Sequence, residues 1–196
     1  MDSLLSKFKS YQGEWYTYKE AGVKETEEII LEDKDYTLNL RLDILGEDVV
    51  YFRLEDYKEY FLGNKRRGPQ ECDLTLLEGN KVYQIEIKDV NKSNANSCFE
   101  EANKQLINSD NILRFILWFV DPADECGLKN FNSEHIIVHI RKQRESLERG
   151  ICYEDNSEYK VVRIPISRRQ KYGTHNLRKI IKNAKHPHLR DGYYTM

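Results

Sequence analysis

Three charged residues in the middle of the chain have types and a spacing that suit metal-assisted hydrolysis. Asp73 lies in one apolar run, CDLTLLE, and Glu86 and Lys88 lie in the next, KVYQIEIKDV. Carboxylate oxygens are the ligands that Mg²⁺ and Mn²⁺ prefer in proteins. Phosphodiester hydrolysis needs a metal that lowers the pKa of a bound water and neutralises phosphate charge, and a cation that orients the attacking water. Two carboxylates and one ammonium group are the types of side chain that this reaction uses.

The turn between the two runs predicts how these residues meet. The dipeptide Gly79-Asn80 is typical of a two-residue hairpin turn. Counting outward from this turn sets Asp73 directly opposite Glu86, and alternation along the strand gives Lys88 the same face as Glu86. One face is then expected to carry Asp73, Thr75, Leu77, Val82, Gln84, Glu86 and Lys88, and the core face Leu74, Leu76, Tyr83, Ile85 and Ile87.

Two opposed carboxylates repel each other, so something is expected to offset the repulsion between Asp73 and Glu86. A divalent cation does so, and Lys88 points its ammonium group at the same spot. The alternative is structural: a solvated sheet edge on which Lys88 simply neutralises Glu86, which contributes little to stability.

The elements that must position these residues follow from periodicity and capping patterns. Downstream, Ser97 to Glu100 reads as a capping box that opens a helix, and the continuous apolar run Ile112–Val120 predicts a buried strand. Another strand is expected at Ile136–Ile140. Upstream, alternation over Tyr36–Ile44 followed by Val49–Leu54 predicts a hairpin, and residues 4–15 predict a short amphipathic helix.

This order of elements, with its acidic pattern, resembles the core of the PD-(D/E)xK nuclease superfamily over roughly residues 70–120. The motif reads Asp73 … Glu86-Ile87-Lys88. The resemblance implies an α/β, restriction-endonuclease-like mixed central sheet flanked by helices on both faces. It also implies Mg²⁺ or Mn²⁺ on Asp73, Glu86 and the carbonyl of Ile87, with Lys88 at the nucleophile and Gln105 as the polar helix residue that many members carry.

The chain departs from the family pattern in two places. No proline precedes Asp73, since the sequence there is GPQECD. The acidic residue usual on the first helix of the family also has no single match here, because four glutamates compete for that position: Glu14, Glu27, Glu28 and Glu59.

Charge is distributed unevenly although the net charge is only -2. Residues 160–190 contain ten Lys or Arg and no Asp or Glu, so the remainder carries about -12. A basic pole of this kind indicates a polyanion partner or, alternatively, a surface that balances the acidic remainder. The nucleic-acid contacts expected from this segment and from a second basic cluster are Lys65, Arg66, Arg67, Arg168, Arg169, Lys171, Arg178, Lys179 and Lys182.

Taken together, these patterns predict one nuclease domain over residues 1–196, with a core at about 36–142 and a basic C-terminal helical extension at about 160–196. Thr174 is expected to cap the last helix. The expected substrate is nucleic acid, with DNA favoured over RNA, and a homodimer or a partner subunit stays open. A non-catalytic nucleic-acid-binding or interaction module on the same fold is the alternative.

The remaining composition fits a cytoplasmic protein. The amino terminus lacks a signal-peptide pattern, and the longest apolar run is about half of the ~20 residues that span a membrane. The four cysteines show no CxxC pair and are expected to be reduced and mostly buried. His135 and His139 share a strand face, and a packed or surface pair is favoured over a metal site because no third ligand accompanies them.

Overall fold

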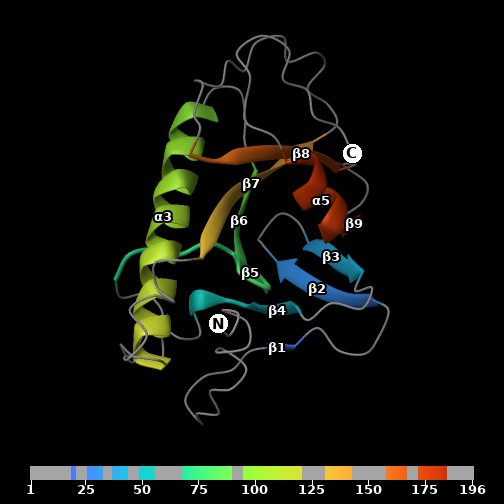
Figure 1. Cartoon of the computed structure of the whole chain (residues 1–196). Coiled ribbons are helices and arrows are strands. Elements are labelled where there is room, and N and C mark those ends of the chain that lie inside the picture. Colours follow the sequence, from blue (N-terminus) through green and yellow to red (C-terminus); the bar gives the residue numbers. More distant parts are fainter. Residues whose placement is uncertain are drawn as a thin grey trace. The chain divides into compact units, whose positions relative to one another are not determined.

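The chain is an α/β protein with a mixed, open central sheet, seen in the computed structural model of Figure 1. The structure describes residues 19–20, 26–32, 37–43, 49–55, 68–89, 95–120, 131–142, 158–166 and 172–184. The chain divides into two compact units. The first contains residues 1–22, 46–86 and 104–135, and the second contains residues 23–45, 87–103 and 136–196.

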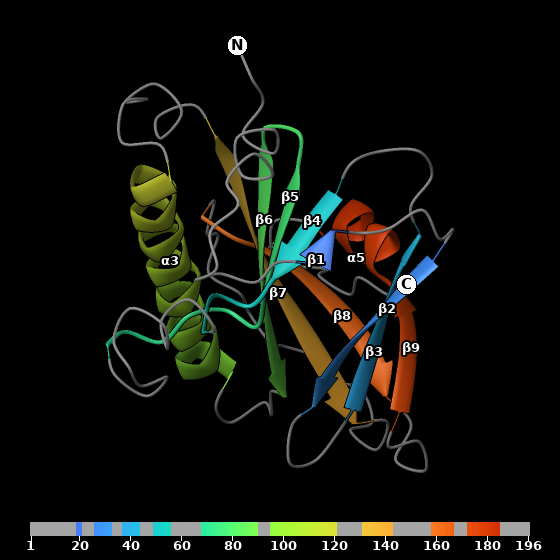
Figure 2. The same ribbon diagram turned by 90° about the horizontal axis from the view of Figure 1, so that it is seen from below.

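The larger sheet has six strands in the order β1-β4-β5-β6-β7-β8. The pairs β1–β4, β4–β5 and β5–β6 are antiparallel, and β7–β8 is parallel. Figure 2 shows β4, β5 and β6 side by side. The bounds are β1 Lys19–Glu20, β4 Val49–Phe52, β5 Leu74–Glu78, β6 Lys81–Asp89, β7 Asn132–Lys142 and β8 Lys160–Ile166.

The β5–β6 hairpin has the register that the sequence predicts. Glu78 pairs with Lys81 across a two-residue turn, and the ladder runs outward to Leu74 opposite Ile85. Gly79 has φ 60°, a left-handed conformation that glycine adopts without a steric penalty. The turn therefore fixes the register on which the proposed site depends.

A second, three-stranded sheet has the order β2-β3-β9, with β2 Thr26–Glu32, β3 Thr37–Asp43 and β9 Tyr172–Asn176. It corrects the predicted N-terminal hairpin. The expected strands at 37–43 and 49–52 exist, but β3 pairs with β2 and β9, whereas β4 pairs with β1 and β5. The β2–β3 register runs from Thr26 opposite Asp43 to Glu32 opposite Thr37.

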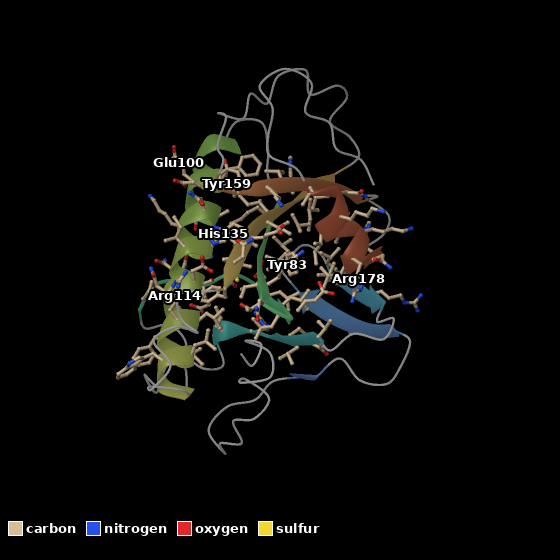
Figure 3. The ribbon with its side chains drawn as sticks, viewed as in Figure 1. Tyr83, Glu100, Arg114, His135, Tyr159 and Arg178 are labelled. Carbon is tan, nitrogen blue, oxygen red and sulfur yellow. The ribbon has the colours of Figure 1, made fainter. Side chains whose placement is uncertain are left out.

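Helix α3, Ala95–Val120, corrects two further predictions. The run Ile112–Val120 is the last part of this helix and not a strand, and Ser97 lies inside the helix and not at its cap. Arg114, which interrupts the apolar run, is exposed on this helix (Figure 3), and its guanidinium lies over the Phe131 ring, 4.3 Å from the centroid. The buried residues recur at helical spacing: Phe99, Ala102, Leu106, Leu113, Ile116 and Leu117.

Helix α5, Leu177–Asn183, ends the described part of the chain. Its N-cap is Asn176, whose side chain accepts a hydrogen bond from the Lys179 N–H at 2.9 Å. The predicted cap, Thr174, instead lies in strand β9. Leu177 and Ile180 are buried, as the helical pattern predicts.

Strand β7 confirms the prediction at Ile136–Ile140. The predicted helix at residues 4–15 lies outside the described residues, so it stays a prediction. Within the described ranges, no helix combines the length and apolarity needed to cross a membrane.

We predict that Leu113→Ala lowers the free energy of unfolding by about 2–5 kcal/mol, because the side chain is fully buried on α3. Ile107→Ala on the same helix is the matched control, since that side chain is 42% exposed. Its effect is expected to stay within about 0.5 kcal/mol in urea unfolding. Equal losses in the two variants would contradict this assignment of the helix faces.

Candidate active site

Asp73 directly precedes β5, and Glu86 lies in β6 next to Ile85, the register partner of Leu74. The ladder of paired residues ends at Leu74 and Ile85, so the pairing of the two acids one position further out stays a prediction. The backbone N–H of Asp73 donates to Glu86 Oε2 at 3.2 Å. The Glu86 carboxylate is therefore fixed against the backbone of the residue that carries the second carboxylate.

The polar face of the β5–β6 hairpin is buried, which corrects the alternative of a solvated sheet edge. Thr75 and Gln84 are 0% exposed and Glu86 is 2% exposed, whereas Asp73 is half-buried. Helix α3 binds this face through Ser109 and Asp110, and the strand order keeps β5 and β6 away from the edges of the sheet. Burial of a carboxylate is costly unless it is hydrogen-bonded or paired with a cation. The hydrogen bond from the Asp73 N–H is one contribution that offsets this cost for Glu86.

The other two residues of the motif lie on the same strand as Glu86. Lys88 is half-buried and follows two positions later, so alternation gives it the same face of β6. Ile87 is 6% exposed, and alternation along the strand turns its side chain to the other face of β6. Only the backbone carbonyl of Ile87 was expected to bind metal, and that role stays a prediction.

Gln105 lies on α3, and its amide Nε2 donates to the Glu71 carbonyl at 3.4 Å. Two neighbouring side chains bind the same segment. Asn108 donates to the Gln70 carbonyl at 3.1 Å, and Ser109 Oγ accepts from the Cys72 N–H at 2.7 Å. One face of α3 thus binds the three residues that precede Asp73.

Gln84 is the centre of a hydrogen-bond network next to the two acids. Its Oε1 accepts from the Thr75 hydroxyl at 2.6 Å and from the Cys72 thiol at 3.0 Å. Its Nε2 donates to Asp110 Oδ1 on α3 at 3.4 Å. The amide connects both strands of the hairpin to the helix.

Asp110 has two more partners, both from β7. The Ser133 hydroxyl donates to its Oδ1 at 2.6 Å, and His135 Nε2 lies 2.8 Å from its Oδ2. Figure 3 shows His135 beside α3. His139 is fully buried, and its ring makes an edge contact with Phe99 at 5.8 Å. Both histidines are therefore packed side chains, as the sequence favoured.

Sequence reasoning missed most of this network. Thr75 and Gln84 carried a usable signal, because they alternate with Asp73 and Glu86 along an otherwise apolar hairpin. Nothing local to Asp110 distinguished it from an ordinary surface acid of a helix. The site residues that sequence analysis did not single out are Cys72, Thr75, Gln84, Ser109, Asp110 and Ser133.

The predicted nucleic-acid contacts are described only in part. Lys179 and Lys182 are exposed on α5 and Arg178 is half-buried there, all within the second unit. Figure 3 shows Arg178 on this helix. The other predicted contacts lie outside the described residues: Lys65, Arg66, Arg67, Arg168, Arg169 and Lys171.

The chemistry of the donor set fits a hard divalent cation. Asp73 and Glu86 carry carboxylates on neighbouring segments that are joined by the Asp73 N–H···Glu86 Oε2 hydrogen bond, and a Mg²⁺ site typically uses one or two protein carboxylates, with water and phosphate completing its ligands. In the described ranges, no group of three or more His, Cys, Asp or Glu side chains is arranged to hold a metal. The pair of acids is therefore the candidate site, and not a closed protein cage.

Comparison of the chain with protein-family models, curated proteins and solved structures found no match.

Cys72 lies within this site as a protonated thiol. Burial raises its pKa from 9.0 to about 12, and the carboxylates of Glu86 and Asp73 act in the same direction. Hydrogen bonds with Ser109 and Thr75 oppose the rise. A thiol in this state donates to Gln84 and is a poor nucleophile. Cys98 is also free, and half-buried.

We predict that native Cys72 resists thiol reagents. In a variant with Cys98→Ser, Cys126→Ser and Cys152→Ser, its labelling rate at pH 8 is expected to be about a thousandfold lower than in urea, because the thiolate is scarce. Its contribution to stability is complete below pH 9 and is lost as pH rises toward 12, since only the unfolded thiol ionises in that window. Fast labelling of the folded variant would contradict the burial.

Proposed function

We propose that this protein is a metal-dependent nuclease of the PD-(D/E)xK type, which hydrolyses phosphodiester bonds of nucleic acid. The observation that carries the proposal is the buried Glu86 carboxylate, which accepts a hydrogen bond from the backbone N–H of a second acid, Asp73. Carboxylate oxygens are the ligands that a hard divalent cation prefers. The same pair suits a site that receives a cation.

Asp73 and Glu86, with the carbonyl of Ile87, would hold Mg²⁺ or Mn²⁺. The bound ion supplies a water of lowered pKa and neutralises charge on the phosphate. The two carboxylates would be held in position before the substrate binds. Glu86 is oriented by the Asp73 N–H, and Asp73 follows a segment that α3 binds through Ser109.

Lys88 and Gln105 would act on the water and the phosphate. An ammonium group on the same strand face as Glu86 attracts the nucleophile and the negative phosphate oxygens. Gln105 lies at that end of β5, where its amide donates to the Glu71 carbonyl just before Asp73, and it would position substrate or water there.

The order of elements supports a restriction-endonuclease-like core. Antiparallel strands β4, β5 and β6 are followed by the long helix α3 and then by β7. Strand β7 takes the place in this order that we predicted for residues 112–120. Its residues Ile136, Ile137 and Val138 are fully buried, as a central strand of such a core requires.

The substrate class follows from charge. Lys179 and Lys182 are exposed, and with Arg178 and the basic residues outside the described ranges they would bind phosphates. Contacts of this kind are independent of base sequence. DNA is the favoured substrate, and a second copy or a partner subunit is compatible with the site.

We predict that Asp73→Ala and Lys88→Ala each reduce Mn²⁺-dependent cleavage of plasmid DNA at least about a hundredfold, since each removes a group that stabilises the charge of the reaction. Binding of DNA and the unfolding transition are expected to survive. The assay compares plasmid, linear DNA and RNA, with and without Mn²⁺.

Glu78→Ala is the matched control, because Glu78 is an acid of the same strand at the turn end, opposite Lys81. It is expected to cleave like the wild type. Wild-type protein that binds DNA with a steep salt dependence but never cleaves it, unchanged by Lys88→Ala, would identify a binding module instead.

We also predict that Lys179→Ala lowers the slope of log affinity against log salt by about 1, because each phosphate contact releases about one counterion. The loss in affinity should be similar for unrelated DNA sequences. Lys104→Ala, an exposed lysine on α3 outside the proposed contacts, is the control. An unchanged slope for Lys179→Ala would remove α5 from the nucleic-acid interface.

A further inference from the structure

The hydrogen-bond network around Gln84 is not used by the proposed reaction, yet it lies one pair of residues from the metal-binding acids. Thr75 is the register partner of Gln84. Asp73 and Glu86 each lie two positions from this pair along the chain, and alternation gives them the same faces of the hairpin. We propose that Gln84 is a positioning residue that holds Asp73 and Glu86 in the arrangement that a divalent cation requires. The inference rests on the proposed function.

The Gln84 amide has a fixed orientation. Its oxygen accepts from two donors, the Thr75 hydroxyl and the Cys72 thiol, and its nitrogen donates to the Asp110 carboxylate. Exchange of the amide oxygen and nitrogen would place the NH₂ group against those two donors and the oxygen against the carboxylate. The side chain is fully buried, so water cannot replace a lost partner without rearrangement.

Asp110, which accepts the hydrogen bond from the Gln84 amide, is itself bound by two other side chains. It accepts from Ser133 at 2.6 Å and faces His135 Nε2 at 2.8 Å, and these two side chains come from strand β7. The contact with His135 is a hydrogen bond in the tautomer that carries a proton on Nε2. Helix α3, β6 and β7 are thereby joined through one carboxylate.

Both acids lie within two residues, along the chain, of a member of the hydrogen-bond network. Cys72 precedes Asp73 directly, and it is held by Gln84 through its thiol and by Ser109 through its N–H. Glu86 follows Gln84 by two positions on the same strand. Two opposed carboxylates move apart unless their backbones are constrained, and the Thr75–Gln84 pair constrains both strands. Outer residues of this kind commonly change metal affinity 10- to 100-fold when they are substituted.

The test is Mn²⁺ affinity, measured by titration calorimetry and by the electron paramagnetic resonance signal of the bound ion. Gln84→Met keeps the shape of the side chain and removes all three hydrogen bonds, and we expect its dissociation constant for Mn²⁺ to rise about tenfold. Thr75→Val should weaken Mn²⁺ binding in the same direction. Thr75→Ser retains the hydroxyl and should restore an affinity close to that of the wild type.

Leu113→Ala is the control for a merely structural effect, because it removes buried contacts of α3 but leaves the network intact. Its Mn²⁺ affinity should equal that of the wild type at a temperature where each variant is folded by circular dichroism. If Gln84→Met binds Mn²⁺ like the wild type, or if Leu113→Ala weakens binding equally, the positioning role is wrong while the proposed function stands. If the wild type does not bind Mn²⁺, both are wrong.

Discussion

The burial of one carboxylate beside another is the constraint on which the first unit depends. Glu86 is almost fully buried, and its carboxylate accepts a hydrogen bond from the Asp73 N–H. Burying a carboxylate in a low-dielectric interior costs free energy unless hydrogen bonds or a cation compensate for the lost water. The polar groups next to Glu86 on this face, Thr75 and Gln84, are hydrogen-bonded to each other, and Gln84 is also hydrogen-bonded to helix α3.

Helix α3 contacts the rest of this unit with two different faces, one apolar and one polar. Its apolar residues, such as Leu106 and Leu113, are fully buried. Its polar residues Ser109 and Asp110 bind the start of β5 and the middle of β6. The Cys72 thiol belongs to the same arrangement, because its high pKa keeps it a hydrogen-bond donor in neutral solution. The helix therefore both fills the core and orients the acids, and separate substitutions can distinguish these two roles.

The local parts of this fold could be predicted from sequence, and the non-local parts could not. The β5–β6 hairpin follows from period-two alternation around Gly79-Asn80, which is information held within eighteen residues, 72–89. The partner of β3 depends on β2 and β9, and the latter is about 130 residues away. The run 112–120 is apolar in either conformation, so periodicity alone did not separate strand from helix. Asp110 and His135 meet only after folding, and neither has a signature of its own.

The length of the turn at Gly79 limits which changes of sequence the hairpin can accept. Side chains alternate sides along a strand, so a single residue gained or lost in the turn would exchange the neighbours Ile85 and Glu86 with respect to β5. A codon insertion there would present an aliphatic group to Asp73 and drive a carboxylate among Leu74 and Leu76. Lineages that descend from this chain are thus free to vary the identity of Asn80 on the exposed turn, but not the length of the turn.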